Sequence, residues 1–194
     1  MVVSLRSDNK SGAPADAFHM EPKRAVATIL SDAEWRDLDA RVKRVDEDRW
    51  LSSRYASLVH RRALISLYAF NYELARVRTA VSEPMLGAIR FQWWRDALEE
   101  LAAGAPPRDH DVVHAIVDAG LPLRRLQALV DAHEIAFETK DRGKEPEDAL
   151  AALAVELIDP SSAQAFVKTA AALGAAFAGA RRGDAEPHKC ALVS

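Results

Sequence analysis

Cysteine is almost absent from this chain, which has Cys190 as its single thiol. One cysteine cannot form an internal disulfide or a cysteine-based zinc site, and such sparse use is typical of a reducing compartment. No apolar run reaches the roughly 18 residues that a membrane-spanning helix needs. The segment 1–20 also lacks the continuous apolar stretch of a secretory signal. These absences predict a cytoplasmic protein.

An excess of charge of either sign is also missing. The chain has 26 Lys and Arg residues against 29 Asp and Glu residues, which gives a net charge of −3. This balance does not indicate nucleic acid as a partner. With 49% hydrophobic and 28% charged residues among 194, the composition excludes disordered and fibrous chains and suffices for one domain with a sizeable core.

The alternation of apolar and polar residues that marks strands is absent as well, and apolar residues recur at spacings of three and four. Ser31 followed by Glu34 is a capping-box pattern, which predicts the start of a first helix with Trp35, Leu38 and Val42 on its apolar side. Further helices are expected at about residues 48–59, 60–80, 84–104, 112–117 and 123–139. The sequence therefore predicts an all-α fold.

The ends of the chain have no helical periodicity. We expect residues 1–30 to form a flexible N-terminal arm, residues 31–180 a helical domain, and residues 181–194 an irregular tail. Two alanine-rich helices should close the domain after Ala149. Asp159 and Pro160 between them have the residue types of an N-cap and a first helical position.

The segment 60–101 is the most informative part of the chain. Its first helix should place one apolar line against the core: Ala63, Leu67, Phe70, Leu74 and Val77. A second, semi-buried line should lie about a third of a turn away: Tyr68, Tyr72, Ala75 and Thr79. In the next helix we expect these residues to be buried: Leu86, Ile89, Trp93, Ala97 and Leu101. We expect these to face water: Gln92, Arg95, Asp96, Glu99 and Glu100.

Two features of this segment allow more than one interpretation. Trp93 and Trp94 either hold their helix against its neighbours, or one of them forms a wall of an apolar ligand cavity. Arg61 and Arg62 either bind a diphosphate or a lipid head group, or form a cap or surface pair near a helix start.

Within this segment, RRALISLYAFNYELARV (61–77) and VSEPMLGAIRFQWWRDAL (81–98) resemble the squalene/phytoene synthase family. The first run has the family's arginine seven residues before a tyrosine that is followed by Ala-Phe, at Arg61, Tyr68, Ala69 and Phe70. The second run is the more specific half, and it resembles the divergent branch related to complex I assembly factor 6. The resemblance extends over about residues 48–180.

The resemblance implies an isoprenoid-synthase-like helical bundle around a central cavity. Enzymes of the family condense two prenyl diphosphates, with Mg²⁺ held by two aspartate-rich motifs on facing helices, because hard Mg²⁺ bridges the leaving diphosphate to carboxylate oxygens. On the family pattern, the two aspartates of the first motif become Ala75 and Thr79, the motif's second residue becomes Arg76, and the arginine before it becomes Tyr72.

The second aspartate-rich helix of the family should lie beyond about residues 174–180. There the only acids are Asp184 and Glu186, and the chain ends at Ser194. The resemblance thus predicts a C-terminally shortened bundle that lacks the last helices and both halves of the metal site. An apolar face left uncovered would permit peripheral contact with a membrane, such as the inner membrane, or with a partner.

These observations predict a non-catalytic family member that resembles respiratory complex I assembly factors and has a prenyl or lipid chain as a candidate ligand. No catalytic residue, metal site or cofactor is predicted. The candidates for the ligand cavity are Arg61, Tyr68, Tyr72, Ala75, Thr79 and Trp93. Two alternatives stay open: a Mg²⁺-dependent prenyltransferase that condenses prenyl diphosphates to a squalene- or phytoene-like product, and a truncated product without a function of its own.

Histidine and cysteine residues offer three further candidate sites. His110 and His114 have the i, i+4 spacing of two zinc ligands but not the HExxH pattern, so we expect solvent-facing histidines at a helix start. His133 lies on an apolar stripe and should be a hydrogen-bonded histidine near the core. Cys190 has no charged pocket or helix start near it in the sequence, so a catalytic thiol is not expected.

Overall fold

The computed structural model describes residues 28–81, 83–139, 146–161 and 163–182. Over these ranges the chain forms eight helices and no strand, which confirms the all-α prediction. The helices are α1 (Asp32–Val45), α2 (Glu47–Ser53), α3 (Leu58–Ala80), α4 (Pro84–Ala102), α5 (Asp111–Asp118), α6 (Leu123–Thr139), α7 (Glu147–Ile158) and α8 (Ala163–Arg182).

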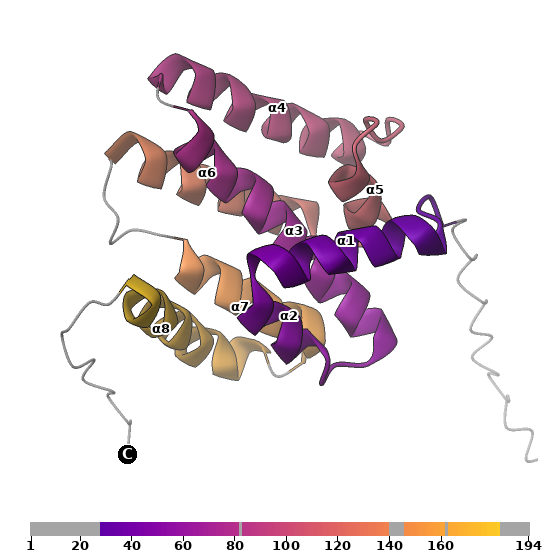
Figure 1. Ribbon diagram of the computed structural model, residues 1–194, viewed down its shortest axis with the longest axis vertical. Helices are drawn as coiled ribbons and strands as arrows, with labels where there is room; N and C mark the ends of the chain where they lie inside the picture. Colours follow the sequence, from indigo (N-terminus) through magenta and orange to yellow (C-terminus); the bar gives the residue numbers. More distant parts are fainter. Residues whose placement is uncertain (1–27, 82, 140–145, 162, 183–194) are drawn as a thin grey trace, which may run out of the picture.

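The long helix α3 passes through the middle of the molecule, as Figure 1 shows. It packs against α1, α2, α4, α5, α6 and α7, while α4 pairs with α6 at one end and α7 pairs with α8 at the other (Figure 1). Every residue from Ala63 to Asn71 is buried. A helix that is buried on all sides forms the centre of a bundle, and α3 has this place here.

The N-terminal end of the described chain is fixed by side-chain caps. The Ser31 hydroxyl oxygen accepts a hydrogen bond from the backbone N–H of Glu34, and the Glu34 carboxylate accepts one from the backbone N–H of Ser31 at 2.7 Å. This confirms the capping box. The Asp118 carboxylate accepts from the backbone N–H groups of Ile29 and Leu30 at 2.7 and 2.9 Å, which ties residues 29–30 of the expected arm to the end of α5.

Two helix boundaries differ from the prediction. The expected helix 48–59 is divided, because Ser57 caps a new helix through a hydrogen bond from the backbone N–H of His60. Asp159 is the C-cap of α7 and not the N-cap of the next helix. Its carboxylate accepts from the backbone N–H and hydroxyl of Ser161 at 3.1 and 2.5 Å, so the chain turns before α8 begins at Ala163.

The predicted buried face of α4 is wrong by about one residue of rotation. Leu86 and Ile89 are 49% and 59% exposed, and the side chain that packs deepest instead is Phe91. The buried face of α4 consists of Gly87, Phe91, Trp94, Ala97 and Leu98. Of the residues expected there, Ala97 is buried, and Trp93 and Leu101 are half-buried.

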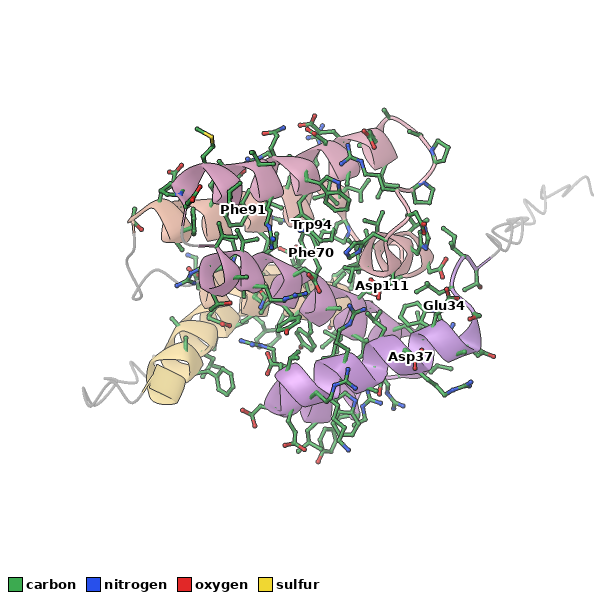
Figure 2. The ribbon with its side chains drawn as sticks, turned by 45° about the horizontal axis from the view of Figure 1, so that its top comes forward. Glu34, Asp37, Phe70, Phe91, Trp94 and Asp111 are labelled. Carbon is green, nitrogen blue, oxygen red and sulfur yellow. The ribbon has the colours of Figure 1, made fainter. Side chains whose placement is uncertain are left out.

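The rotation of α4 follows from its contact with α6. A Cβ atom at Gly87 would lie 2.4 Å from the Phe137 ring, so only glycine allows this approach. Phe91 meets Phe137 edge-on at 5.8 Å, and Trp94 meets Phe70 of α3 edge-on at 5.1 Å. Figure 2 shows Phe70, Phe91 and Trp94 gathered between α3 and α4.

Several sequence predictions concern residues outside the described ranges. These are the arm over residues 1–27, the tail over residues 183–194, the two acids Asp184 and Glu186, and Cys190.

Candidate functional site

The candidate site begins on α3, where the family pattern places its first aspartate motif. The apolar line Ala63, Leu67, Phe70, Leu74 and Val77 is buried as predicted. On the second line, exposure rises along the helix. Tyr68 is buried, Tyr72 and Ala75 are half-buried, and Thr79 is exposed. The line therefore runs from the interior to the surface.

No carboxylate is present at the motif positions of this line. Position 75 carries a methyl group, and the Thr79 hydroxyl donates to the backbone carbonyl of Arg76 at 3.2 Å. The guanidinium of Arg76 lies 5.6 Å from the centre of the Tyr72 ring. The nearby acid Glu73 pairs with Arg76 at 3.2 Å and with Arg41 of α1 at 3.7 Å. This face thus presents an aromatic ring and guanidinium groups.

Next to the buried end of this line lies an interior polar cluster, formed by Asp46, Arg49, Tyr68, Glu147 and Phe177. The Arg49 guanidinium donates to the Asp46 carboxylate at 2.5 Å and to the Glu147 carboxylate of α7. It also lies 5.3 Å from the centre of the Phe177 ring of α8. One cation therefore joins α2, α7 and α8 beside the centre of the bundle.

Burial and neighbouring charges in this cluster shift the pKa values of Arg49 and Tyr68. Burial alone would lower the pKa of Arg49, but the carboxylates of Glu147 and Asp46 outweigh it and hold that pKa above its usual value. Burial raises the pKa of the Tyr68 hydroxyl, against the opposing effects of Arg49 and a hydrogen bond with Ser52. The cluster thus favours the charged form of the Arg49 guanidinium and the neutral form of the Tyr68 phenol.

The carboxylates of Asp46 and Glu147 belong to the type of group that binds metal ions, but both bond Arg49. Two interior carboxylates from different helices are the kind of ligand pair that would hold a divalent cation. Here both bond the same guanidinium, which supplies the positive charge itself. In the described part of the chain, no group of three or more His, Cys, Asp or Glu side chains is placed to hold a metal ion.

Sequence reasoning missed this cluster. Arg49 and Glu147 are 98 residues apart, so no short-range spacing in the sequence predicts their ion pair. The only signal within reach was the i, i+3 pair of Asp46 and Arg49. Gly174 is a further missed residue. A Cβ atom there would lie 2.3 Å from the carbonyl oxygen of Glu147, so the glycine lets α8 approach the cluster closely.

The remaining candidates for a ligand cavity lie in separate surroundings. Trp93 packs edge-on against Trp94 at 4.8 Å, with the Arg108 guanidinium 5.1 Å from its ring centre. Trp94 also contacts Phe70 of α3, and both tryptophan rings lie next to His110 at the start of α5. Arg61 donates to the backbone carbonyls of Arg54 and Ala56 at 3.0 and 3.3 Å, across the turn between α2 and α3.

Two of the three histidines singled out in the sequence, His110 and His133, form side-chain hydrogen bonds. His110 is the N-cap of α5, and its Nδ1 accepts from the backbone N–H of Val112 at 3.2 Å. His110 and His114 are both half-buried rather than solvent-facing. His133 is buried with its Nε2 2.9 Å from the Asn71 side-chain oxygen, which confirms the hydrogen-bonded histidine. Burial, and to a lesser extent Arg78, lowers the pKa of His133 to about 3.

Two of the surface hollows bear on the candidate site. One, of about 340 Å³, lies between α1 and the start of α3 and includes Arg61. The other, of about 760 Å³, lies between the start of α3, the α5–α6 turn, the end of α7 and the first turns of α8. Neither hollow is lined by the other predicted cavity residues: Tyr68, Tyr72, Ala75, Thr79 and Trp93. Over the described ranges, no helix is both long and apolar enough to cross a bilayer.

The fold and the α3 pattern agree with a comparison to known protein families. The sequence model of the squalene/phytoene synthase family matches residues 42–148, and the chain belongs to this family. The matched region runs from the end of α1 to the start of α7, so it contains α3 and most of the interior cluster.

Individual relatives point to one branch of the family, as the sequence predicted. The human protein named NADH dehydrogenase (ubiquinone) complex I, assembly factor 6 is 30% identical over 124 residues, which cover 60% of this chain and 37% of that protein. The mouse protein of the same name is 29% identical over 102 residues, which cover 51% of this chain and 31% of that protein. The chain spans about a third of the length of these curated relatives. No solved structure matches the chain.

Proposed function

We propose that this chain is a non-catalytic member of the squalene/phytoene synthase family that assists the assembly of a respiratory complex. The observation that carries the proposal is the interior cluster, where Arg49 bonds both the Asp46 and the Glu147 carboxylates. A guanidinium in this position occupies oxygen atoms of both acids and offsets one of their two negative charges, which weakens their attraction for Mg²⁺. The loss of both motif acids, at Ala75 and Thr79, supports the same proposal.

The assembly role rests on the relatives, which carry the name of a complex I assembly factor. Its test is loss of the gene in the source organism, followed by native electrophoresis of the membrane complexes. We expect less mature NADH dehydrogenase and an accumulation of its partial assemblies, both restored by the wild-type gene. Normal amounts of the mature complex would count against the assembly role.

The absence of catalysis is tested on the purified chain with farnesyl or geranylgeranyl diphosphate and Mg²⁺. We expect no diphosphate release above that of a boiled sample. Steady turnover would favour the alternative, a prenyltransferase of the squalene or phytoene type. A chain that unfolds without a cooperative transition would favour the other alternative, a truncated product without function.

The ligand part of the proposal is a prenyl or lipid chain in the 760 Å³ hollow. Its lining includes the apolar side chains of Val59, Leu157 and Val167. Arg125 is paired with Glu156 of the same lining at 2.8 Å, and Lys168 adds a further cation. An apolar floor beside a cation is suited to a lipid with an anionic head.

The hollow is tested with Val59→Asp, which places a carboxylate at a lining position that is 76% exposed. We expect weaker binding of a fluorescent fatty acid. The matched control is Tyr55→Asp, because Tyr55 is 90% exposed and lies neither in the lining of the hollow nor on α4. Equal affinities of both variants and the wild type would reject this site.

Peripheral contact with a membrane belongs to the same proposal, together with a cytoplasmic location. It is supported by the exposed apolar face of α4, which consists of Met85, Leu86 and Ile89. Co-sedimentation with vesicles made from the lipids of the source membrane is its test. We expect Met85→Asp to lower the bound fraction, and an unchanged fraction would reject this face as the contact.

A further inference from the structure

The smaller hollow is rich in arginine. It lies between α1 and the turn that leads into α3, has a volume of about 340 Å³, and is lined by Arg36, Arg54, Arg61 and Arg62 together with Trp35. We call it the arginine hollow. Guanidinium groups are planar, permanently charged donors, and they suit the oxygen atoms of phosphate and carboxylate groups.

Two of these arginines are already neutralised. Arg54 pairs with Asp39 at 2.6 Å, and Arg62 pairs with Asp32 at 3.4 Å. Arg36 and Arg61 form no ion pair with a carboxylate in the described ranges. The hollow therefore keeps two positive charges in excess of its two aspartates, and a concave surface of one sign concentrates ions of the opposite sign.

Two buried hydrogen-bond donors without a partner also favour an anion as the ligand of this hollow. Trp35 is only 6% exposed, and its Nε1 is buried with no hydrogen-bond partner among the described residues. The Nε of Arg61 is buried and unpaired in the same way. Both atoms can only donate, and buried donors without a partner are rare in native structures. An acceptor that reaches these atoms from the hollow would satisfy both donors.

Two of the arginine side chains that line the hollow are held in place by contacts within the protein. The Arg62 guanidinium lies 5.0 Å from the centre of the Trp35 ring, and the Arg61 guanidinium is tied to the carbonyls of Arg54 and Ala56. Side chains that are already held in place lose little freedom when a ligand arrives.

We propose that the arginine hollow binds a phosphate-type oxyanion. A tetrahedral oxyanion offers several acceptor atoms and negative charge in one small group, which matches two unpaired donors beside two uncompensated guanidiniums. The group can come from free phosphate or from the phosphate head group of a lipid. This inference does not depend on the proposed function, since the hollow lies apart from the interior cluster.

The first experiment is calorimetric titration of the full chain with inorganic phosphate at low ionic strength. We expect saturable binding in the wild type and a loss of about tenfold in affinity in Arg36→Gln, the effect of one charge-assisted hydrogen bond. The matched control is Arg44→Gln, because Arg44 is an exposed arginine of the same helix that does not line the hollow. Equal losses in both variants would mean unspecific charge attraction and would overturn the proposal, as would a wild type that does not saturate.

A second variant tests the unpaired donor. Trp35→Phe keeps a ring under Arg62 but removes the Nε1 donor, so we expect weaker phosphate binding in a chain that melts no lower than the wild type. Unchanged affinity in both Trp35→Phe and Arg36→Gln would refute the site.

The source of the anion is distinguished with vesicles of phosphatidylcholine, with and without phosphatidic acid. If the head group is the source, vesicles that contain phosphatidic acid bind the wild type, free phosphate competes, and Arg36→Gln binds less. If the source is soluble, Arg36→Gln changes the affinity for inorganic phosphate and leaves vesicle binding as it was. Either pattern supports the oxyanion site.

Discussion

Replacing Arg49 by methionine tests whether the interior cluster holds the bundle together. The guanidinium of Arg49 joins the carboxylates of Asp46 and Glu147, and all three side chains are less than one-fifth exposed. Removal of one partner from a buried ion pair leaves an uncompensated charge and costs about 3–5 kcal/mol. A single domain is stable by only about 5–15 kcal/mol, so Arg49→Met should lower the urea midpoint by a large fraction.

Three companion variants separate the ion pair from simple loss of packing: Glu147→Leu, Arg49→Met/Glu147→Leu and Arg44→Met. In Arg49→Met/Glu147→Leu one carboxylate is removed together with the guanidinium, so the double variant should lose less than the sum of the two single variants. The difference is expected to be about 0.5–3 kcal/mol. Arg44→Met, at an exposed position of α1, should stay within about 0.5 kcal/mol of the wild type. Circular dichroism during urea unfolding gives all four values. Strict additivity, or an Arg49→Met variant as stable as Arg44→Met, would refute the reasoning.

Three further predictions concern stability. Because the folded pKa of His133 is lowered to about 3 while the unfolded value is near 6.5, the unfolded chain binds one more proton between these values. The stability that comes from keeping His133 neutral is complete above pH 6.5, and it falls by about 1.4 kcal/mol per pH unit as the pH drops toward 3. Urea unfolding at several pH values should therefore show that the free energy of unfolding depends less steeply on pH in His133→Gln than in the wild type. Gly87→Ala, which would normally favour a helix, should destabilise by about 1–3 kcal/mol because of Phe137, and Phe137→Leu in the same chain should recover part of the loss in thermal melts. Ser31→Ala should cost about 1 kcal/mol in the same assay, and no loss would mean that the capping box contributes nothing.

The parts of the fold that could be predicted depend on short-range patterns. Ser31 and Glu34 are three residues apart, and their hydrogen bonds are the ones that the capping-box pattern predicts. The apolar line of α3 was predicted for the same reason, since a buried face repeats every three or four residues. The end of α2 was not predicted, because Ser57 is equally compatible with a polar position inside a helix. Only the structure shows that its hydroxyl accepts a hydrogen bond from the backbone N–H of His60.

The buried face of α4 could not be read from hydrophobicity alone. Leu86 and Ile89 are larger apolar residues than Gly87, so a pattern based on apolar character selects the wrong side. The buried side of α4 is decided by how closely α4 and α6 approach each other. Gly87 permits contact with the Phe137 ring, which lies 50 residues further along the chain. Sequence patterns describe what a residue would prefer, and a close approach is a property of two elements.

The same limit explains the candidate site. The sequence shows that the acids of the first aspartate motif are absent at Ala75 and Thr79, but it does not show what takes the place of a metal ion. Arg49 and Glu147 belong to different helices, and only the bundle brings a guanidinium between two interior carboxylates. If Arg49 is what makes the interior cation unnecessary, the stability lost in Arg49→Met should be partly recovered by millimolar Mg²⁺, which the two carboxylates could then bind. A variant that gains nothing from Mg²⁺, relative to the wild type in the same buffer, would show that the carboxylates are not placed to hold an ion and that Arg49 has a purely structural role.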